Sequence, residues 1–177
     1  PRNNAYDAQR KIIARDSSYV QFWMAWSALE PIEANKDYLS QPSGYLQAIE
    51  QAVNACRDYG IKVEFVFFHC PAWASESGIS GGQRPRQGTF PAFVGRVAKH
   101  FKGRVESYQL SHEVNNQAMM QGADVDFLIK EIFISGAQAV RKVYEEDPKL
   151  PVLISTSGMS PCENCGQMNG LAAKGGR

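Results

Sequence analysis

The 177-residue chain alternates between two kinds of hydrophobic pattern. One kind places apolar residues about every three to four positions, which is typical of a helix with one buried face. The other is a short run of β-branched and aromatic residues, which is typical of a strand in a parallel sheet. The predicted elements follow in chain order: helix 5–15, strand 19–26, helix 44–59, strand 61–68, helix 90–101, strand 105–110, helix 124–146 and strand 152–155.

This alternation predicts an α/β fold with parallel strands joined by right-handed crossovers. Both a doubly wound sheet and a (β/α)8 barrel fit the order. A nucleotide-binding doubly wound sheet needs a glycine-rich turn directly after a strand, and the chain has none. Polar residues instead follow the ends of successive strands, which favours a barrel. Strand 19–26 is so apolar that we expect both of its faces to be buried, with a loop after it at 27–31.

Composition narrows the range of partners. The chain has 19 basic and 18 acidic side chains, so it lacks the basic surface of a nucleic-acid-binding protein. No run reaches the roughly 18 apolar residues of a membrane span. We therefore expect neither a nucleic-acid nor a membrane partner. The chain starts at Pro1 without a signal peptide, which predicts a processed, trimmed or partial chain. The compartment stays open, with an extracellular or periplasmic location favoured.

The four cysteines give little support for a metal site. Cys56 lies in a predicted helix and Cys70 at a strand end, and both are expected to be buried thiols. Cys162 and Cys165 have the spacing of a zinc or disulfide pair, but no second pair accompanies them. We therefore predict no metal and no cofactor.

The strongest candidate for chemistry is the stretch 104–116. It begins as a strand and ends in an imidazole, a carboxylic acid and two amides, contributed by His112, Glu113, Asn115 and Asn116. A strand that delivers such groups at its carboxyl end is typical of a barrel enzyme. The alternative is a polar turn whose side chains bond only to nearby backbone.

Other strand ends carry further candidates. Trp26 ends the first strand, and His69 and Trp73 follow the second. Both tryptophans are candidate platforms for a sugar ring, and Trp26 fits equally well as core. His69 either lines the cleft or bonds to a backbone carbonyl. We expect Glu30, after the first strand, to be a structural or rim carboxylate.

Four local motifs occur in order between about residues 19 and 158. They are W-x-x-x-E-P at 26–31, P-x-W at 71–73, the stretch from Phe101 to His112-Glu113, and Asp147-Pro148-Lys149 before the last strand. In this order they resemble the second to fifth strands of the retaining glycoside hydrolases of clan A. That (β/α)8 group includes cellulases, mannanases, xylosidases and iduronidase-like enzymes.

The resemblance implies a single domain, 1–177, that forms part of a TIM barrel of about four βα units, with a loop-rich tail at 159–177. It implies a hydrolase that cleaves O-glycosyl bonds of a polysaccharide or oligosaccharide, with Glu113 as general acid/base. The residues that the resemblance and the strand ends assign to substrate binding are His112, Asn116, Trp73, His69 and Trp26.

Two departures from the family pattern bear on activity. The family has Asn before the acid/base Glu, whereas this chain has His112, which can donate a similar hydrogen bond but has a titratable ring. Val114 replaces the proline that follows that Glu. The family's nucleophile closes the seventh strand, and only four strands are predicted here, so we expect the nucleophile outside this chain. A longer protein, a second chain or a second copy then completes the barrel.

Two other functions stay open. One is a non-catalytic carbohydrate-binding or structural relative, in which His112 reflects lost catalysis. The other is a phosphate-binding barrel that uses Arg84 and Arg86 in the long loop 74–89. In each case a half-barrel is expected to expose two sheet edges and an apolar interior.

Overall fold

The computed structural model describes residues 18–33 and 43–161. The helix predicted at 5–15 and most of the tail, with Cys162 and Cys165, lie outside the described residues. The other predicted strands and helices are confirmed, with ends that shift by a few residues. In chain order the elements are β1 (Tyr19–Ala25), α2 (Trp26–Leu29), α3 (Gly44–Asp58), β2 (Lys62–Phe68), the 3-10 turn η1 (Ala72–Ala74), α4 (Thr89–His100), β3 (Ser107–His112), α5 (Val125–Phe127), the π-helical η2 (Leu128–Ile134), α6 (Ser135–Tyr144) and β4 (Leu153–Gly158).

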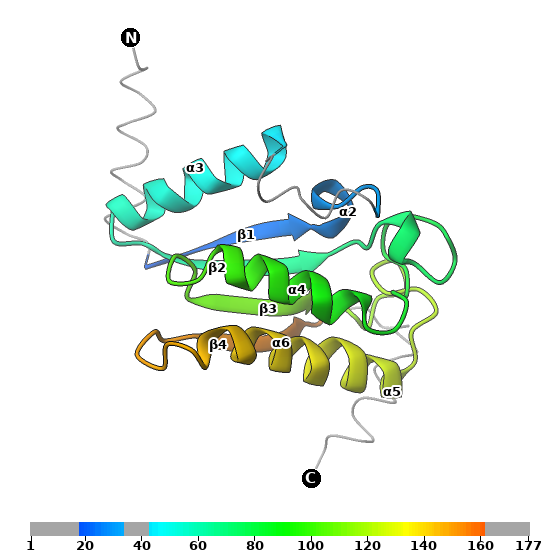
Figure 1. Ribbon diagram of the computed structural model, residues 1–177. Coiled ribbons are helices and arrows are strands. Elements are labelled where there is room, and N and C mark those ends of the chain that lie inside the picture. The colour runs from blue at the N-terminus through cyan, green and yellow to red at the C-terminus, as the bar shows by residue number, and fades with distance from the viewer. Residues whose placement is uncertain (1–17, 34–42, 162–177) are drawn as a thin grey trace.

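The four strands form one parallel sheet in the order β1-β2-β3-β4, so each strand pairs with its neighbour in the chain. Right-handed crossovers between such neighbours place every connecting helix on the same face. A doubly wound sheet reverses its strand order and carries helices on both faces. The sheet is therefore part of a TIM barrel, with α3, α4 and α6 along its outer side (Figure 1).

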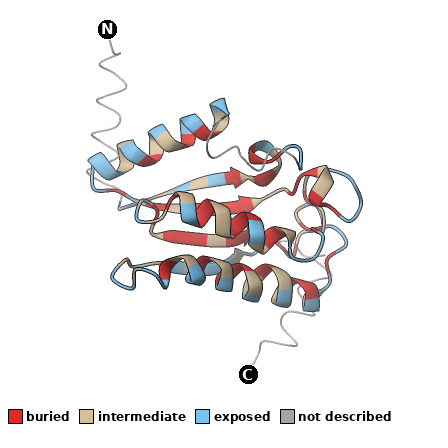
Figure 2. Ribbon diagram, in the orientation of Figure 1, coloured by how far each residue is buried: buried red, intermediate tan, exposed pale blue. Residues whose placement is uncertain are grey.

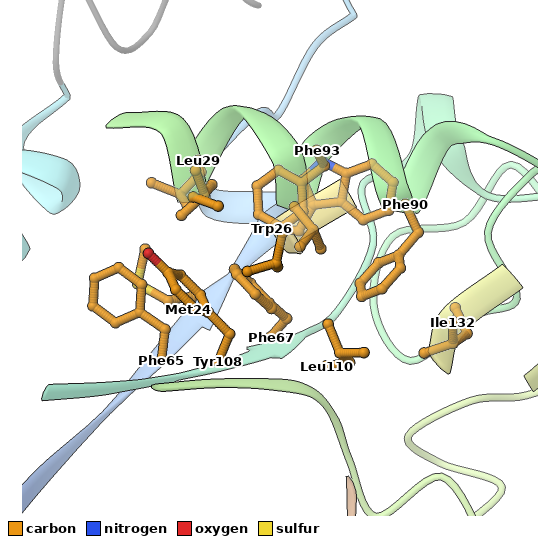
Figure 3. Close-up of a cluster of buried hydrophobic side chains, with 14 of the residues drawn as sticks. Met24, Trp26, Leu29, Phe65, Phe67, Phe90, Phe93, Tyr108, Leu110 and Ile132 are labelled. Carbon is orange, nitrogen blue, oxygen red and sulfur yellow. The ribbon is translucent and has the colours of Figure 1, made fainter. Parts of the chain in front are cut away.

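The hydrophobic core lies between the sheet and these helices, whose buried faces turn toward the strands (Figure 2). Aromatic rings from β2, β3 and α4 meet there (Figure 3). Phe65 packs edge-on against Phe101 with ring centroids 4.8 Å apart, and Phe67 packs against Phe93 at 5.5 Å. Because each buried ring contributes about 1.5–3 kcal/mol, this layer holds the strands in a fixed position.

The opposite face of the sheet has no helix over it among the described residues, and it mixes polar with apolar side chains. Gln21, Glu64 and Ser107 lie in register across β1, β2 and β3, and Gln109 and Ser155 lie in register on the same face. The expected apolar interior is therefore confirmed only in part: Tyr19, Trp23 and Leu153 are exposed on this face, but polar side chains lie between them. Side chains alternate between the two faces along β3. Tyr108 and Leu110 therefore lie on the helix side, whereas Ser107 and Gln109 lie on the open face.

The expectation that both faces of the first strand are buried is wrong. Tyr19 and Trp23 are 43% and 44% exposed, whereas Met24 is completely buried under the helices. Within the described residues all the connecting helices lie on one face of the sheet, so only the helix-facing side of β1 is covered. β1 and β4 are the edge strands, so the expectation of two sheet edges is confirmed within the described residues. Leu153 of β4, which shares the open face with Ser107, is 60% exposed.

Two connecting segments differ from prediction in local form. The loop expected at 27–31 is mostly the short helix α2, which the hydrogen bond from the Glu30 N–H to the Trp26 carbonyl closes at 2.9 Å. The sequence offers Asp124 or Asp126 as the cap of the long helix, and the cap is Asp124, whose side chain accepts the Phe127 N–H at 2.8 Å. The helix then passes through the π-helical η2, where the Ser135 hydroxyl donates to a backbone carbonyl. None of the helices in the described ranges has the length and apolarity needed to cross a bilayer.

Candidate active site

Two neighbouring strands end in residues with left-handed backbone conformation. His69 directly follows β2 with φ of 54°, and Glu113 directly follows β3 with φ of 45°. Such values are uncommon for residues other than glycine, because the Cβ atom crowds the backbone. Strained residues of this kind cluster at functional sites. Both lie at the carboxyl ends of the parallel strands, which is the end where barrel enzymes carry their active sites.

The backbone on both sides holds Glu113 in place. Its N–H donates to the Gly158 carbonyl of β4 at 2.9 Å, and its own carbonyl accepts the Asn116 N–H at 2.7 Å. The carboxylate lies between two polar neighbours, with the His112 Nε2 atom 3.7 Å from Oε1 and the Asn116 amide 3.5 Å from Oε2. With 28% of its side chain exposed, Glu113 stays accessible to a ligand.

An aromatic row runs across the polar face beside this carboxylate. It consists of Trp23, Phe68, His69 and His112. The Trp23 ring lies 4.2 Å from the His112 ring and packs edge-on against Phe68 at 5.3 Å, and Phe68 contacts His69 at 4.6 Å. Three strands thus contribute flat rings to one surface that ends at Glu113.

Sequence reasoning missed Trp23 and Phe68 as members of this row. The observation that could have found them is the alternation of side chains between the two faces of a strand. Met24 is the buried, helix-facing residue, so its neighbour Trp23 has to point to the opposite face. The same alternation separates Phe67, which is in the core, from Phe68, which is half-buried. Once the helices are known to cover only one face of the sheet, the alternation assigns both rings to the open face.

His69 and Cys70 lie partly or wholly out of solvent. Burial lowers the pKa of His69, so its imidazole is neutral near pH 7. Burial raises the pKa of the Cys70 thiol to about 11, so Cys70 is not a thiolate nucleophile. Both line a cavity of about 20 Å³ next to Ser111, which is large enough for one water molecule. His69 thus borders the aromatic row and this cavity.

The two asparagines of the stretch 104–116 have different settings. Asn115 is completely buried, and its side chain exchanges two hydrogen bonds of 2.8 Å with the Ser160 backbone. Asn116 accepts the Ala118 N–H at 3.0 Å through its side-chain oxygen and turns its amide toward Glu113. Asn115 therefore fixes the loop, whereas Asn116 both caps a turn and borders the carboxylate.

Trp26 is part of the core, which corrects its prediction as a sugar platform. Its ring is 2% exposed and stacks on Phe93 at 4.9 Å. Its indole N–H donates to the Glu30 carboxylate at 2.8 Å. Trp73 is half-buried, and its indole N–H donates to the Glu30 carbonyl at 2.7 Å. These contacts tie both tryptophans to the segment after β1.

Glu30 itself is a structural carboxylate, as expected. It is 0% exposed, and the Arg96 guanidinium of α4 bonds to both of its oxygens at 2.6–2.9 Å. A carboxylate locked in this way cannot take part in chemistry on the open face.

The long loop does not offer Arg84 as a free anion site, which argues against the phosphate-binding alternative. The Arg84 guanidinium lies 3.1 Å from Glu76 and 3.1 Å from Asp124, and it covers the Phe127 ring at 4.2 Å. The loop is held against residues 118–122. A Cβ atom on Gly82 would lie 1.9 Å from the Ala118 carbonyl oxygen, so only glycine fits there.

Comparison with known sequences gave no relative: neither a protein-family model nor a curated protein matches the chain. Comparison with solved structures gave several. A family 39 glycoside hydrolase from the gut symbiont Bacteroides cellulosilyticus WH2 matches over 99% of this chain, with 18% identity and a TM-score of 0.60. A β-glucosidase from Exiguobacterium marinum matches over 85%, with 17% identity and a TM-score of 0.56. Xylanase 10B from Thermotoga petrophila RKU-1 matches over 88%, with 17% identity and a TM-score of 0.51.

These likenesses confirm the predicted fold: the chain has the fold of part of a glycoside hydrolase barrel. The chain spans 34%, 37% and 46% of the lengths of these three structures, which is less than half of each.

Proposed function

We propose that this chain contributes the acid/base half of a retaining glycosidase active site, with Glu113 as the general acid/base. The observation that carries the proposal is the position of Glu113. It stands in a strained conformation at the carboxyl end of β3, is partly exposed, and lies beside an aromatic row on the open face. The fold shared with glycoside hydrolases supports the same assignment.

In this proposal Glu113 donates its proton to the glycosidic oxygen as the bond from that oxygen to the anomeric carbon breaks. A second carboxylate attacks the anomeric carbon from the opposite face and forms a glycosyl ester. Glu113, now ionised, then takes a proton from water, and the resulting hydroxide oxygen displaces the ester. The two carboxyl groups must lie about 5–5.5 Å apart, and we propose that the part of the barrel beyond this chain supplies the second.

We propose that the aromatic row and the residues around Glu113 bind the sugar. Trp23 offers an exposed flat face next to His112, and flat rings match the apolar faces of sugars. His112 and Asn116 border the two oxygens of Glu113, where they can bond to sugar hydroxyls. An imidazole in place of the family's amide changes the shape and hydrogen bonding of the site, so we expect it to affect which sugar is accepted.

The test is the substitution Glu113→Gln in the complete protein, assayed on glycosides with different leaving groups. Loss of a general acid should lower kcat by roughly 10²–10⁴-fold on substrates with poor leaving groups. A nitrophenyl glycoside should suffer less in the bond-breaking step, because its leaving group needs no proton. Glu146→Gln, an exposed carboxylate on the helix side, is the matched control.

A uniform, small loss on all substrates would contradict the acid/base role of Glu113. Binding of oligosaccharides by an unmodified protein that hydrolyses none of them would instead support the second candidate function, a carbohydrate-binding relative. His112 in place of Asn is the feature that favours this alternative.

A further inference from the structure

A row of three polar side chains crosses the open face below the aromatic row. The Gln21 amide donates to one oxygen of the Glu64 carboxylate at 2.8 Å, and the Ser107 hydroxyl donates to the other at 2.9 Å. The three residues are in register on β1, β2 and β3, so Glu64 stands in the middle of the sheet. This polar row is unusual, because barrel interiors are filled mainly by bulky branched apolar side chains.

The charge of Glu64 has no cationic partner within ion-pair distance among the described residues. Its two hydrogen-bond donors are neutral. Lys62 is the nearest basic residue on the same face of β2, and its ammonium group lies over the Tyr19 ring, 5.5 Å from the centroid. A carboxylate has about four acceptor positions, and the two neutral donors leave about two of them open on the side away from the sheet.

Closure of the barrel would take this carboxylate out of water. An ionised carboxylate without a partner is costly in a closed interior, and two neutral hydrogen bonds offset only part of that cost. The described sheet has four strands, against eight in a (β/α)8 barrel, so the segment that faces Glu64 is expected to come from the remaining βα units. Charge complementarity then requires that segment to place a basic side chain near the Glu64 carboxylate.

We propose that the part of the barrel that covers this face places an arginine or lysine side chain against Glu64. An arginine suits the site best, because its planar fork can donate to both open positions of the carboxylate. Glu64 thereby contributes to the recognition of the completing half, at a level of the barrel below the active site. The inference rests on the barrel fold and not on glycosidase activity.

The test is Glu64→Gln in the complete protein, with the thermal unfolding midpoint as the readout. Gln has nearly the same shape but cannot pair with a cation. Removal of one partner of a buried pair should lower Tm by roughly 5–15 °C. Glu146→Gln, which removes a charge from an 83% exposed side chain, should leave Tm nearly unchanged. A Tm that is unchanged or higher in Glu64→Gln would overturn the proposal, because it would mean that Glu64 has no cation to lose.

A structure of the complete barrel decides the matter even if the variant does not fold. We expect a guanidinium or ammonium nitrogen within about 4 Å of the Glu64 carboxylate, from outside residues 18–161. An apolar or amide side chain over Glu64 would overturn the proposal. Neither readout depends on catalysis, so failure of this inference is distinguishable from failure of the proposed function.

Discussion

The left-handed conformations of His69 and Glu113 put two chemically capable side chains at adjacent strand ends. A residue in this region costs of order 1–3 kcal/mol, and the packed strands and their hydrogen bonds must offset that cost. At Glu113 the bonds to Gly158 and Asn116 do so. At His69 the carbonyl accepts the Ser27 N–H at 2.9 Å, which joins the end of β2 to the start of α2. The local strain therefore sets the direction in which each side chain points.

His69 should make the stability of the protein sensitive to mild acid. Its pKa is lowered from 6.5 by burial, so the unfolded chain binds a proton more readily than the folded one below that pH. Stability should therefore fall as the pH drops from about 6.5 through the lower folded-state value. His69→Asn removes the titrating group and tolerates the left-handed backbone. Calorimetry between pH 8 and pH 5 should give a shallower decline of Tm for the variant than for the wild type. Parallel declines would contradict the prediction.

Trp23 should contribute to substrate affinity more than to the chemical step. Its ring is 44% exposed, so its removal leaves the core intact. We expect Trp23→Ala to raise KM about 3- to 10-fold, which corresponds to an aromatic contact of about 0.5–1.5 kcal/mol, and to change kcat little. Trp23→Phe should recover part of the affinity. Steady-state kinetics on an oligosaccharide substrate separates the two effects, and a loss confined to kcat would contradict this role.

At the scale of elements, the ion pair of Glu30 and Arg96 joins the segment after β1 to helix α4. It also anchors two indole N–H groups, one on the Glu30 carboxylate and one on its carbonyl. The pair thereby holds α2, η1 and α4 together at the carboxyl end of the sheet, directly behind β1 and β2. These contacts stabilise the helix side of the sheet without any contribution from residues on the open face.

Removal of Arg96 should be strongly destabilising. Arg96→Met leaves a completely buried carboxylate without its cation, and the cost of an unpaired buried charge is about 3–5 kcal/mol. The double variant Glu30→Gln/Arg96→Met should recover much of the loss, because Gln can still accept the Trp26 N–H. Urea unfolding midpoints test this, with the exposed Lys99→Met on the same helix as control. An equal loss in the single and double variants would argue against a charge effect.

The order of the elements was predictable because each rests on a pattern within one segment. The helical stripes and the strand-end position of Glu113 follow from local sequence and are confirmed. The place of Trp26 was not predictable in the same way. Its burial depends on Phe93, which lies far along the chain, and on the helical turn of α2. The aromatic row likewise depends on which face of the sheet the helices cover. The order of the strands determines this, and it cannot be read from a single segment.

At the scale of the molecule, the two faces of the sheet differ. Helices cover one face, and no helix among the described residues covers the other. The helix side buries a continuous apolar core, so it needs nothing further to be stable. The open side presents Glu113, the aromatic row and the polar row, to which the two proposals assign roles in a closed barrel. From the number of strands, the sequence predicts that further βα units complete the barrel, and this stays a prediction. Sequence reasoning did not foresee the row of Gln21, Glu64 and Ser107 on the open face, because the strand register that aligns these residues cannot be read from composition.

The sequential strand order also bears on how the chain assembles as it is synthesised. The paired side chains Gln21 and Glu64, and then Glu64 and Ser107, are each separated by 43 residues. Each strand can therefore find its partner as soon as the next βα unit has left the ribosome, without waiting for a distant segment. Ser107 and Leu153, paired in the third step, are 46 residues apart, so the entropy of loop closure is nearly the same at each of the three steps. Growth of the sheet can thus proceed from the N-terminal side, one unit at a time, and each new unit presents the edge on which the following one forms.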